Sequence, residues 1–110
     1  LPGVPLEKMP GGTVFKEKYK QRFNQQIQLY AAYVYDAVMV MADAMQRANS
    51  ADPAKYLPEV GKAQYQGVTA KITFDTKGDL ATPAVSIYQD KGGNWAFVET
   101  VSAPATPAAK

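Results

Sequence analysis

The chain has 110 residues, of which 46% are hydrophobic and 20% are charged, a balance typical of a single small globular domain. Its net charge of +2 is too small to predict a nucleic-acid-binding surface. Cysteine and histidine are both absent, which excludes disulfides, thiol nucleophiles, the usual zinc ligands and histidine-based acid–base catalysis within these residues.

The first twelve residues hold three prolines and three glycines, which predict a loop. The chain begins at Leu1, with no apolar signal-peptide core and no run long enough to span a membrane. We therefore expect it to be an excised or processed piece of a longer protein.

A short helix is predicted over residues 13–23, with Thr13 as its N-cap and with Phe15, Tyr19 and Phe23 along one face. The other face carries four basic residues, Lys16, Lys18, Lys20 and Arg22. This cluster is compatible with an anionic partner, but a solvated helix face is the favoured interpretation.

The longest predicted helix covers residues 28–49. Its apolar positions form one broad face, made of Ile27, Tyr30, Ala31, Val34, Val38, Met41, Met45 and Ala48. The polar stripe is narrow and consists of Gln28, Asp36, Asp43, Gln46 and Arg47. We therefore expect burial over most of the circumference. Asp43 and Arg47 are four residues apart, which predicts a weak ion pair of about 0.3–0.5 kcal/mol.

A third helix is predicted to start with Asp52 as N-cap and Pro53 at the first helical position, and to end near Ala63. Pro58 is an unfavourable residue in its middle.

The hydrophobic period changes to two over residues 68–74, which predicts a half-buried strand. Residues 75–79 predict a turn in which Asp75 bonds nearby amides and Gly78 has a positive φ. Two further strands, over residues 85–89 and 95–101, predict a β-hairpin. The Ala/Pro-rich residues 102–110 are predicted to be a disordered tail.

No catalytic constellation is recognisable. Asp36 and Asp43 share a helix face, but their spacing separates their Cα atoms by about 10.5 Å, far from the ~5–5.5 Å of carboxyl pairs in retaining glycosidases. Solvated or capping roles are expected for both. Ser50 has no histidine to activate it. We therefore predict that the protein is not an enzyme and holds no metal or cofactor.

Three tyrosines, Tyr30, Tyr33 and Tyr35, lie close together at the start of the long helix. Core packing with a hydroxyl at the rim is the simpler interpretation. The alternative is that one of them lines an apolar ligand pocket, since such pockets favour aromatic walls with few polar groups.

Three segments resemble the C-terminal region of the periplasmic Leu/Ile/Val-binding proteins: LYAAYVYDAVMVMADAMQRANSADPAKY, YQGVTAKITFDTKGD and VSIYQDKGGNW. The most specific pieces are Tyr35-Asp36-Ala37 and the turn formed by Phe74-Asp75 with Lys77-Gly78-Asp79. The likeness runs from about Leu6 to Val101. This chain has Ala70 where many relatives have glycine, which we expect to affect strand packing more than ligand choice.

The resemblance implies an α+β fragment of an α/β, two-lobed protein of the type I periplasmic-binding fold, with about three helices followed by an edge strand and a β-hairpin. Residues 1–84 would belong to the first lobe and residues 85–101 to a hairpin of the second, with Pro83 near a crossing between the lobes. The strands that the long helix should cover are absent, so we expect the isolated chain to be marginally stable or to self-associate.

The function that the resemblance implies is that of an extracytoplasmic, periplasmic solute-binding component of an ABC transporter. Its two lobes would close on leucine, isoleucine, valine or a similar amino acid, and its partner would be the membrane permease. Tyr30 matches the position of an aromatic wall residue in the family, so it is the candidate ligand-binding residue. The alternatives are a stand-alone protein-interaction module and a ligand-sensing domain of the same fold.

Overall fold

The computed structural model of the protein describes residues 3–104 and residue 107. Within them, a short 3-10 turn at Leu6–Lys8 precedes three helices, which are α1 (Gly12–Phe23), α2 (Ala31–Ala48) and α3 (Pro53–Gly61). Four strands follow, β1 (Tyr65–Gln66), β2 (Lys71–Ile72), β3 (Ala84–Lys91) and β4 (Asn94–Ser102), and they pair as two separate antiparallel sheets. The predicted order of helices, a short strand region and a hairpin is confirmed.

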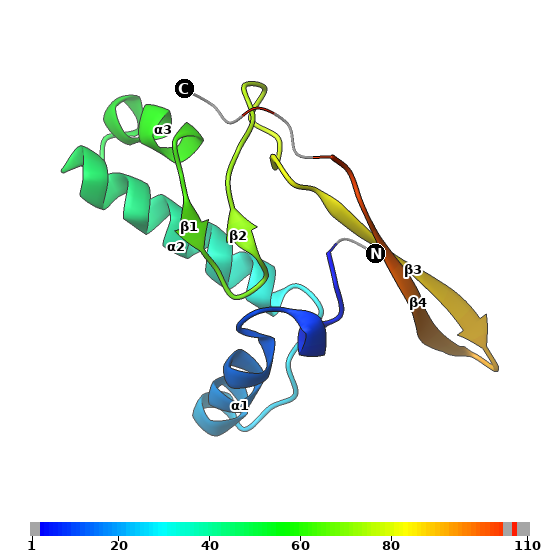
Figure 1. Ribbon diagram of the computed structural model, residues 1–110. Coiled ribbons are helices and arrows are strands. Elements are labelled where there is room, and N and C mark those ends of the chain that lie inside the picture. Colours follow the sequence, from blue (N-terminus) through cyan, green and yellow to red (C-terminus); the bar gives the residue numbers. More distant parts are fainter. Residues whose placement is uncertain (1–2, 105–106, 108–110) are drawn as a thin grey trace.

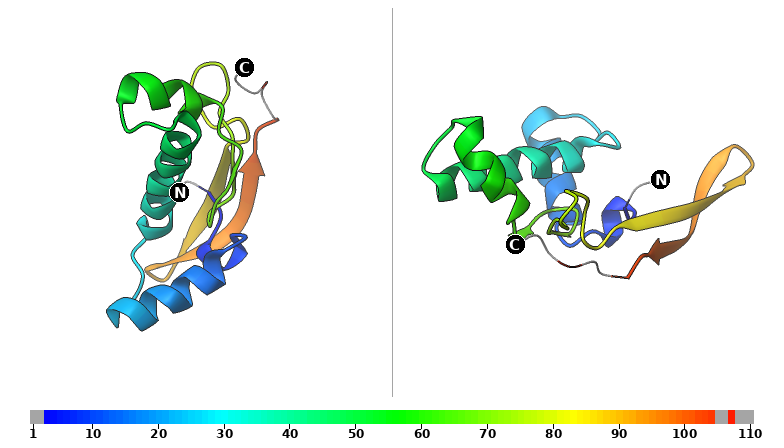
Figure 2. Two further views of the ribbon diagram at one scale, coloured as in Figure 1. Left: turned by 90° about the vertical axis from the view of Figure 1, so that its left-hand side faces the viewer. Right: turned by 90° about the horizontal axis from the view of Figure 1, so that it is seen from above.

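The elements form two parts. The helices and the β1–β2 pair form a helical unit, and the β3–β4 hairpin projects away from it (Figure 1). The view from above shows the hairpin reaching beyond the helices (Figure 2). The radius of gyration is 15.8 Å, whereas a compact domain of this length has about 13 Å. The fold is therefore extended and leaves faces of its elements uncovered.

Helix α2 begins three residues later than predicted, because Tyr30 has non-helical dihedrals (φ −97°, ψ 0°) and serves as the N-cap. The helix ends at Asn49, which adopts the left-handed conformation that commonly terminates helices. The residues of α2 that are buried lie on one face and are mostly small: Ala32, Asp36, Val40 and Ala44.

The opposite side of α2 is exposed. Val34 is 60% accessible, Val38 is 59% accessible and Met41 is 42% accessible. The prediction that this helix is buried over most of its circumference is therefore wrong for the described residues. The observed exposure agrees with an expectation from the sequence, namely that this chain lacks the strands against which the apolar face of the helix would pack.

Helix α1 starts at Gly12 rather than Thr13, and its N-cap is Gly11 with no side-chain cap. The prediction that Thr13 caps this helix is wrong. The aromatic ladder is as predicted, with ring centroids of Phe15 and Tyr19 6.3 Å apart and those of Tyr19 and Phe23 4.9 Å apart. The four basic residues of α1 are exposed, as expected of a solvated face.

Helix α3 forms as predicted. The Asp52 carboxylate accepts a hydrogen bond from the Ala54 amide at 3.1 Å, and Pro53 opens the helix. The helix continues through Pro58 to Gly61.

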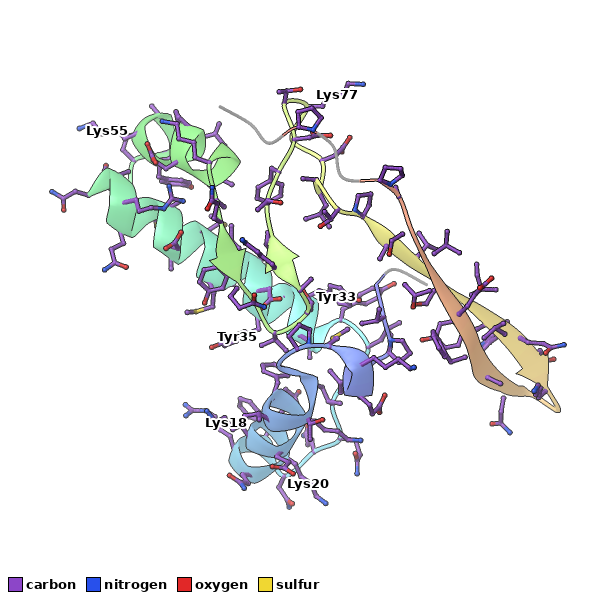
Figure 3. All side chains as sticks on the ribbon, viewed as in Figure 1. Lys18, Lys20, Tyr33, Tyr35, Lys55 and Lys77 are labelled. Atoms are coloured by element: carbon purple, nitrogen blue, oxygen red, sulfur yellow. The ribbon has the colours of Figure 1, made fainter. Side chains whose placement is uncertain are left out.

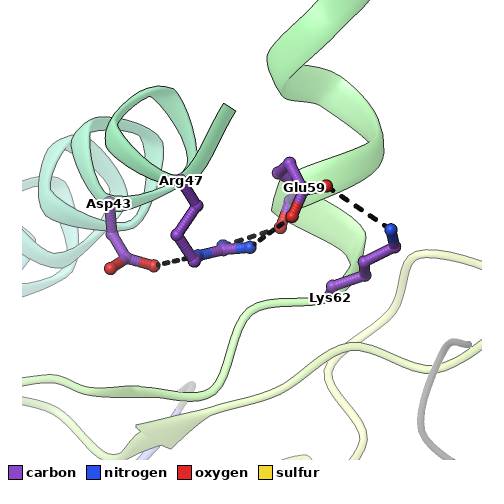
Figure 4. A network of polar contacts seen from close by, with 4 residues as sticks. All are labelled: Asp43, Arg47, Glu59 and Lys62. Carbon is purple, nitrogen blue, oxygen red and sulfur yellow. Dashed lines mark hydrogen bonds and ion pairs between the residues drawn. The ribbon is translucent and has the colours of Figure 1, made fainter. Parts of the chain in front are cut away.

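A polar network joins α2 to α3 (Figure 4). Arg47 pairs with Asp43 at 3.0 Å, as predicted, and also reaches Glu59 on α3, where one nitrogen meets the carboxylate at 2.7 Å. A second Arg47 nitrogen donates to the Glu59 carbonyl at 2.7 Å. Lys62 completes the network with a 3.4 Å contact to the other Glu59 oxygen.

The strand predicted over residues 68–74 is much shorter in the structure. Only Lys71 and Ile72 form β2, paired with Gln66 and Tyr65 of β1, and Phe74 makes an isolated bridge to Leu80. The turn at residues 75–79 is confirmed. The Asp75 carboxylate accepts from the Lys77 amide at 2.8 Å and from the Asp79 amide at 3.0 Å, and Gly78 has φ +91°.

The predicted hairpin is confirmed and is slightly longer at each end. Its register runs from Ala84 opposite Ser102 to Lys91 opposite Asn94, with an irregularity between Ile87 and Tyr88. Ser102 therefore belongs to β4.

Most of the predicted tail, residues 105–106 and 108–110, lies outside the described residues. In the part of the chain that is described, no helix has the length and apolar character needed to cross a bilayer.

Candidate ligand-binding site

The loop of residues 67–70 is anchored to α2 by a buried carboxylate. Asp36 is 2% accessible. It accepts hydrogen bonds from the Val68 amide at 2.8 Å, the Thr69 amide at 2.9 Å and the Thr69 hydroxyl at 2.6 Å. The solvated role expected for Asp36 is wrong, whereas its capping of backbone amides agrees with the second role. These bonds also explain the short β2, because the amides of residues 68 and 69 bond a side chain instead of a strand.

The helical unit and the hairpin meet at a joint formed by Gly3, Ala84, Ser86 and Thr100. The Gly3 amide donates to the Ala84 carbonyl at 3.0 Å. The Ser86 hydroxyl is 2% accessible and donates to the Gly3 carbonyl, and it lies 3.0 Å from the Thr100 hydroxyl. The chain segments at residue 3 and residues 84–86 are thus bonded side by side.

Tyr33 reaches this joint from α2 (Figure 3). A Cβ atom on Gly3 would overlap the Tyr33 hydroxyl, so only glycine permits this approach. Burial raises the pKa of Tyr33, with smaller contributions from Tyr88, Asp36 and Tyr30. The hydroxyl therefore stays protonated at neutral pH and is able to donate a hydrogen bond.

A hollow of about 400 Å³ lies between the two parts. On the side of the helical unit it is lined by residues 4–7, Met9, residues 27–29, Ala32 and Tyr33. On the hairpin side three aromatic residues line it, Tyr88, Trp95 and Phe97. The hollow thus combines an aromatic wall on the hairpin side with polar groups on the helical side, among them Glu7 and Gln28.

The three tyrosines singled out from the sequence have different surroundings. Tyr33 lines the hollow. Tyr30 is 56% accessible, and its ring centroid is 6.4 Å from that of Tyr33, but it is not among the residues lining the hollow. Tyr35 turns toward α1, where its ring centroid lies 5.1 Å from that of Phe15. The structure thus brings Tyr30 and Tyr33 together and separates Tyr35 from them.

The hairpin's contribution to this hollow could not be found from the sequence. In the sequence, these three aromatic residues (Tyr88, Trp95 and Phe97) look like ordinary strand residues. No local signal indicates that they face residues more than fifty positions earlier.

The two acids of the long helix bond other groups and do not line this hollow. Asp36 bonds the loop, and Asp43 pairs with Arg47. Within residues 3–104 and 107, no group of three or more Asp, Glu, His or Cys side chains is placed to hold a metal ion.

Comparison with known proteins places the chain. Residues 13–93 match the family described as "receptor family ligand binding region". The structure is similar to that of the leucine-binding protein LivK from Thermotoga maritima, with a TM-score of 0.73 and 29% sequence identity. The similarity covers 89% of this chain but 29% of that protein. Because the family match extends over most of its length, this chain belongs to the receptor ligand-binding-region family and has part of a type I periplasmic-binding fold.

Proposed function

We propose that these residues are the C-terminal part of an extracytoplasmic solute-binding protein that delivers a branched-chain or related amino acid to an ABC-transporter permease. The observation that carries the proposal is the backbone similarity to a leucine-binding protein over 89% of this chain. Both the matched family and the matched structure are named for ligand binding, in agreement with a binding protein rather than an enzyme.

We assign residues 1–84 to one lobe and the hairpin, residues 85–101, to the other. The joint at Gly3, Ala84 and Ser86 supports this division, because it brings two chain segments together where the two parts meet. The hollow between the parts would then belong to the cleft between lobes, where a ligand is enclosed when they close.

The rest of the protein would cover the exposed side of α2. On that side Val34 is 60% accessible and Val38 is 59% accessible. Strands supplied by sequence outside this chain would cover these side chains, since an uncovered apolar face of this kind is rare in a soluble monomer.

Tyr30 is the proposed ligand wall residue: it does not itself line the hollow, but its ring centroid lies 6.4 Å from that of Tyr33, which does. The test is isothermal titration of the full-length protein with leucine, isoleucine and valine. Tyr30→Ala is expected to weaken binding about 10- to 100-fold, as for loss of a buried aromatic contact of about 1.4–2.8 kcal/mol. Phe23→Ala is the matched control, because Phe23 is 53% accessible, close to Tyr30 at 56%, and lies at the end of α1.

Unchanged affinity in Tyr30→Ala would remove this residue from the site. Absence of binding of all three amino acids by the full-length wild type would refute the proposed ligand class.

A further inference from the structure

Besides the joint, a cation–aromatic contact bridges the two parts of the molecule. The Lys8 ammonium, at the end of the 3-10 turn in the helical unit, lies 4.7 Å from the centroid of the Phe97 ring in the hairpin. This is within the roughly 6 Å over which a cation is attracted to an aromatic face. Phe97 lines the hollow, as do both sequence neighbours of Lys8, Glu7 and Met9.

The ring is positioned by the hairpin itself. Phe97 is paired with Tyr88 in the β3–β4 register, and the two rings meet edge to face at a centroid distance of 5.8 Å. The register irregularity between Ile87 and Tyr88 falls between the joint at Ser86 and this aromatic pair. Such irregularities bend a strand and redirect its side chains, and this one lies next to the aromatic pair that faces Lys8.

The charges near Lys8 do not offer it a competing partner. The adjacent acid, Glu7, lies 3.9 Å from Lys16 of α1. Among the described residues no ion pair includes Lys8. Within residues 3–104 and 107, the Phe97 ring is therefore the partner found for this ammonium.

The geometry makes the contact sensitive to rotation about the joint. Tyr88 is two residues beyond Ser86, about 7 Å along the strand. The 4.7 Å separation lies about 1.3 Å inside the interaction limit of about 6 Å. A rotation of about 15° about the joint moves a point 7 Å away by about 1.8 Å, which is enough to break the contact when the movement separates the two groups.

We propose that Lys8 and Phe97 form a latch between the two lobes that favours the interlobe arrangement seen here and sets its population before ligand binds. The joint acts as the pivot and the cation–aromatic contact as the element that opens. The inference rests on the proposed function only in taking the hairpin to belong to the second lobe.

The test measures the ligand-free full-length protein. Spin labels at Lys55→Cys on α3 and Asn94→Cys at the hairpin tip report the distance between the two parts, and this chain has no cysteine of its own. Lys8→Met keeps the apolar stem and removes the charge. It is expected to lower the population of the observed arrangement, relative to the others, about two- to fivefold.

Three further variants make the result specific. Lys8→Arg, which keeps a cation able to lie on the ring, is expected to preserve the wild-type distribution. Phe97→Leu is expected to match Lys8→Met, and the double variant is expected to show no more than either single change. Lys20→Met on α1 removes an equivalent charge away from the hairpin and is the control.

An unchanged distance distribution in Lys8→Met, or effects of Lys8→Met and Phe97→Leu that simply add, would overturn the latch. Because no ligand is present, this result is independent of whether the amino-acid ligand is correctly assigned. Failure of the full-length protein to bind any amino acid would refute the proposed function and leave the distance measurement interpretable.

Discussion

Thr69 donates two hydrogen bonds to one carboxylate oxygen of Asp36, from its amide at 2.9 Å and from its hydroxyl at 2.6 Å. Because Asp36 is in the second turn of α2 and Thr69 is in the loop after β1, this pair joins segments 33 residues apart. It gives a physical reason for an acid in the apolar Tyr35-Asp36-Ala37 segment.

Replacing Asp36 with asparagine is expected to destabilise the full-length protein by about 2 kcal/mol. The substitution removes the charge that strengthens these bonds and turns an amide donor toward the Thr69 donors. Urea denaturation measures the change. Asp43→Asn on the same helix is the control, with an expected cost of about 0.3–0.5 kcal/mol, because its bond to Arg47 is partly exposed. Equal costs for the two variants would contradict the anchoring role of Asp36.

Replacing Gly67 with alanine is expected to destabilise the protein by about 1–3 kcal/mol. A Cβ at this position would lie 2.5 Å from an Asp36 oxygen, so the loop or the helix must shift. Gly61→Ala in α3 meets no atom within 4 Å and is expected to be neutral or stabilising by up to about 1 kcal/mol. Thermal melting should show a lower melting temperature for Gly67→Ala and an unchanged or higher one for Gly61→Ala, and a neutral Gly67→Ala would argue against the close packing of loop and helix.

The raised pKa of Tyr33 predicts a pH dependence of stability. In the unfolded chain the hydroxyl loses its proton near its ordinary pKa of 10.0, whereas in the folded protein it keeps the proton to higher pH. The contribution of the protonated Tyr33 hydroxyl to the free energy of unfolding is therefore fully present below about pH 9. It is lost as pH rises through the folded-state pKa. The stability difference between wild type and Tyr33→Phe should be constant below about pH 9 and change in favour of the phenylalanine variant above it. A difference independent of pH would show that the hydroxyl is not desolvated.

The isolated chain is expected to self-associate. Val34 and Val38 present a side of α2 that nothing in the described residues covers. Sedimentation velocity should show a concentration-dependent mass, and Val38→Lys should raise the monomer fraction severalfold. Val14→Lys is the control, since Val14 is 56% accessible on α1, close to Val38 at 59%. A monomer at all concentrations would contradict the prediction.

The isolated chain is also expected to bind leucine at least 100-fold more weakly than the full-length protein. Groups that hold the charged ends of an amino acid would lie mainly in sequence outside this chain, and each such bond is worth about 1.5–3 kcal/mol. Calorimetry of the two proteins side by side measures the ratio. Equal affinities would place the complete site within these residues.

The local elements followed from the sequence wherever short-range chemistry decides the backbone. Asp52-Pro53 opens α3, Asp75 and Gly78 shape their turn, and Asp43 pairs with Arg47 as predicted. Each depends on groups within four residues of one another, so their spacing in the sequence is also their spacing in space. The resemblance to the binding-protein family likewise rests on such local segments.

Only the tertiary structure decided how distant segments are used. The alternation over residues 68–74 predicted a longer strand, but the amides of Val68 and Thr69 bond Asp36 instead of a neighbouring strand. The sequence likewise gave no sign that Ser86 would bond Gly3 or that Phe97 would lie under Lys8. Hydrophobic period reports which side of an element is apolar, whereas the partner that a buried polar group finds depends on how the whole chain folds back on itself.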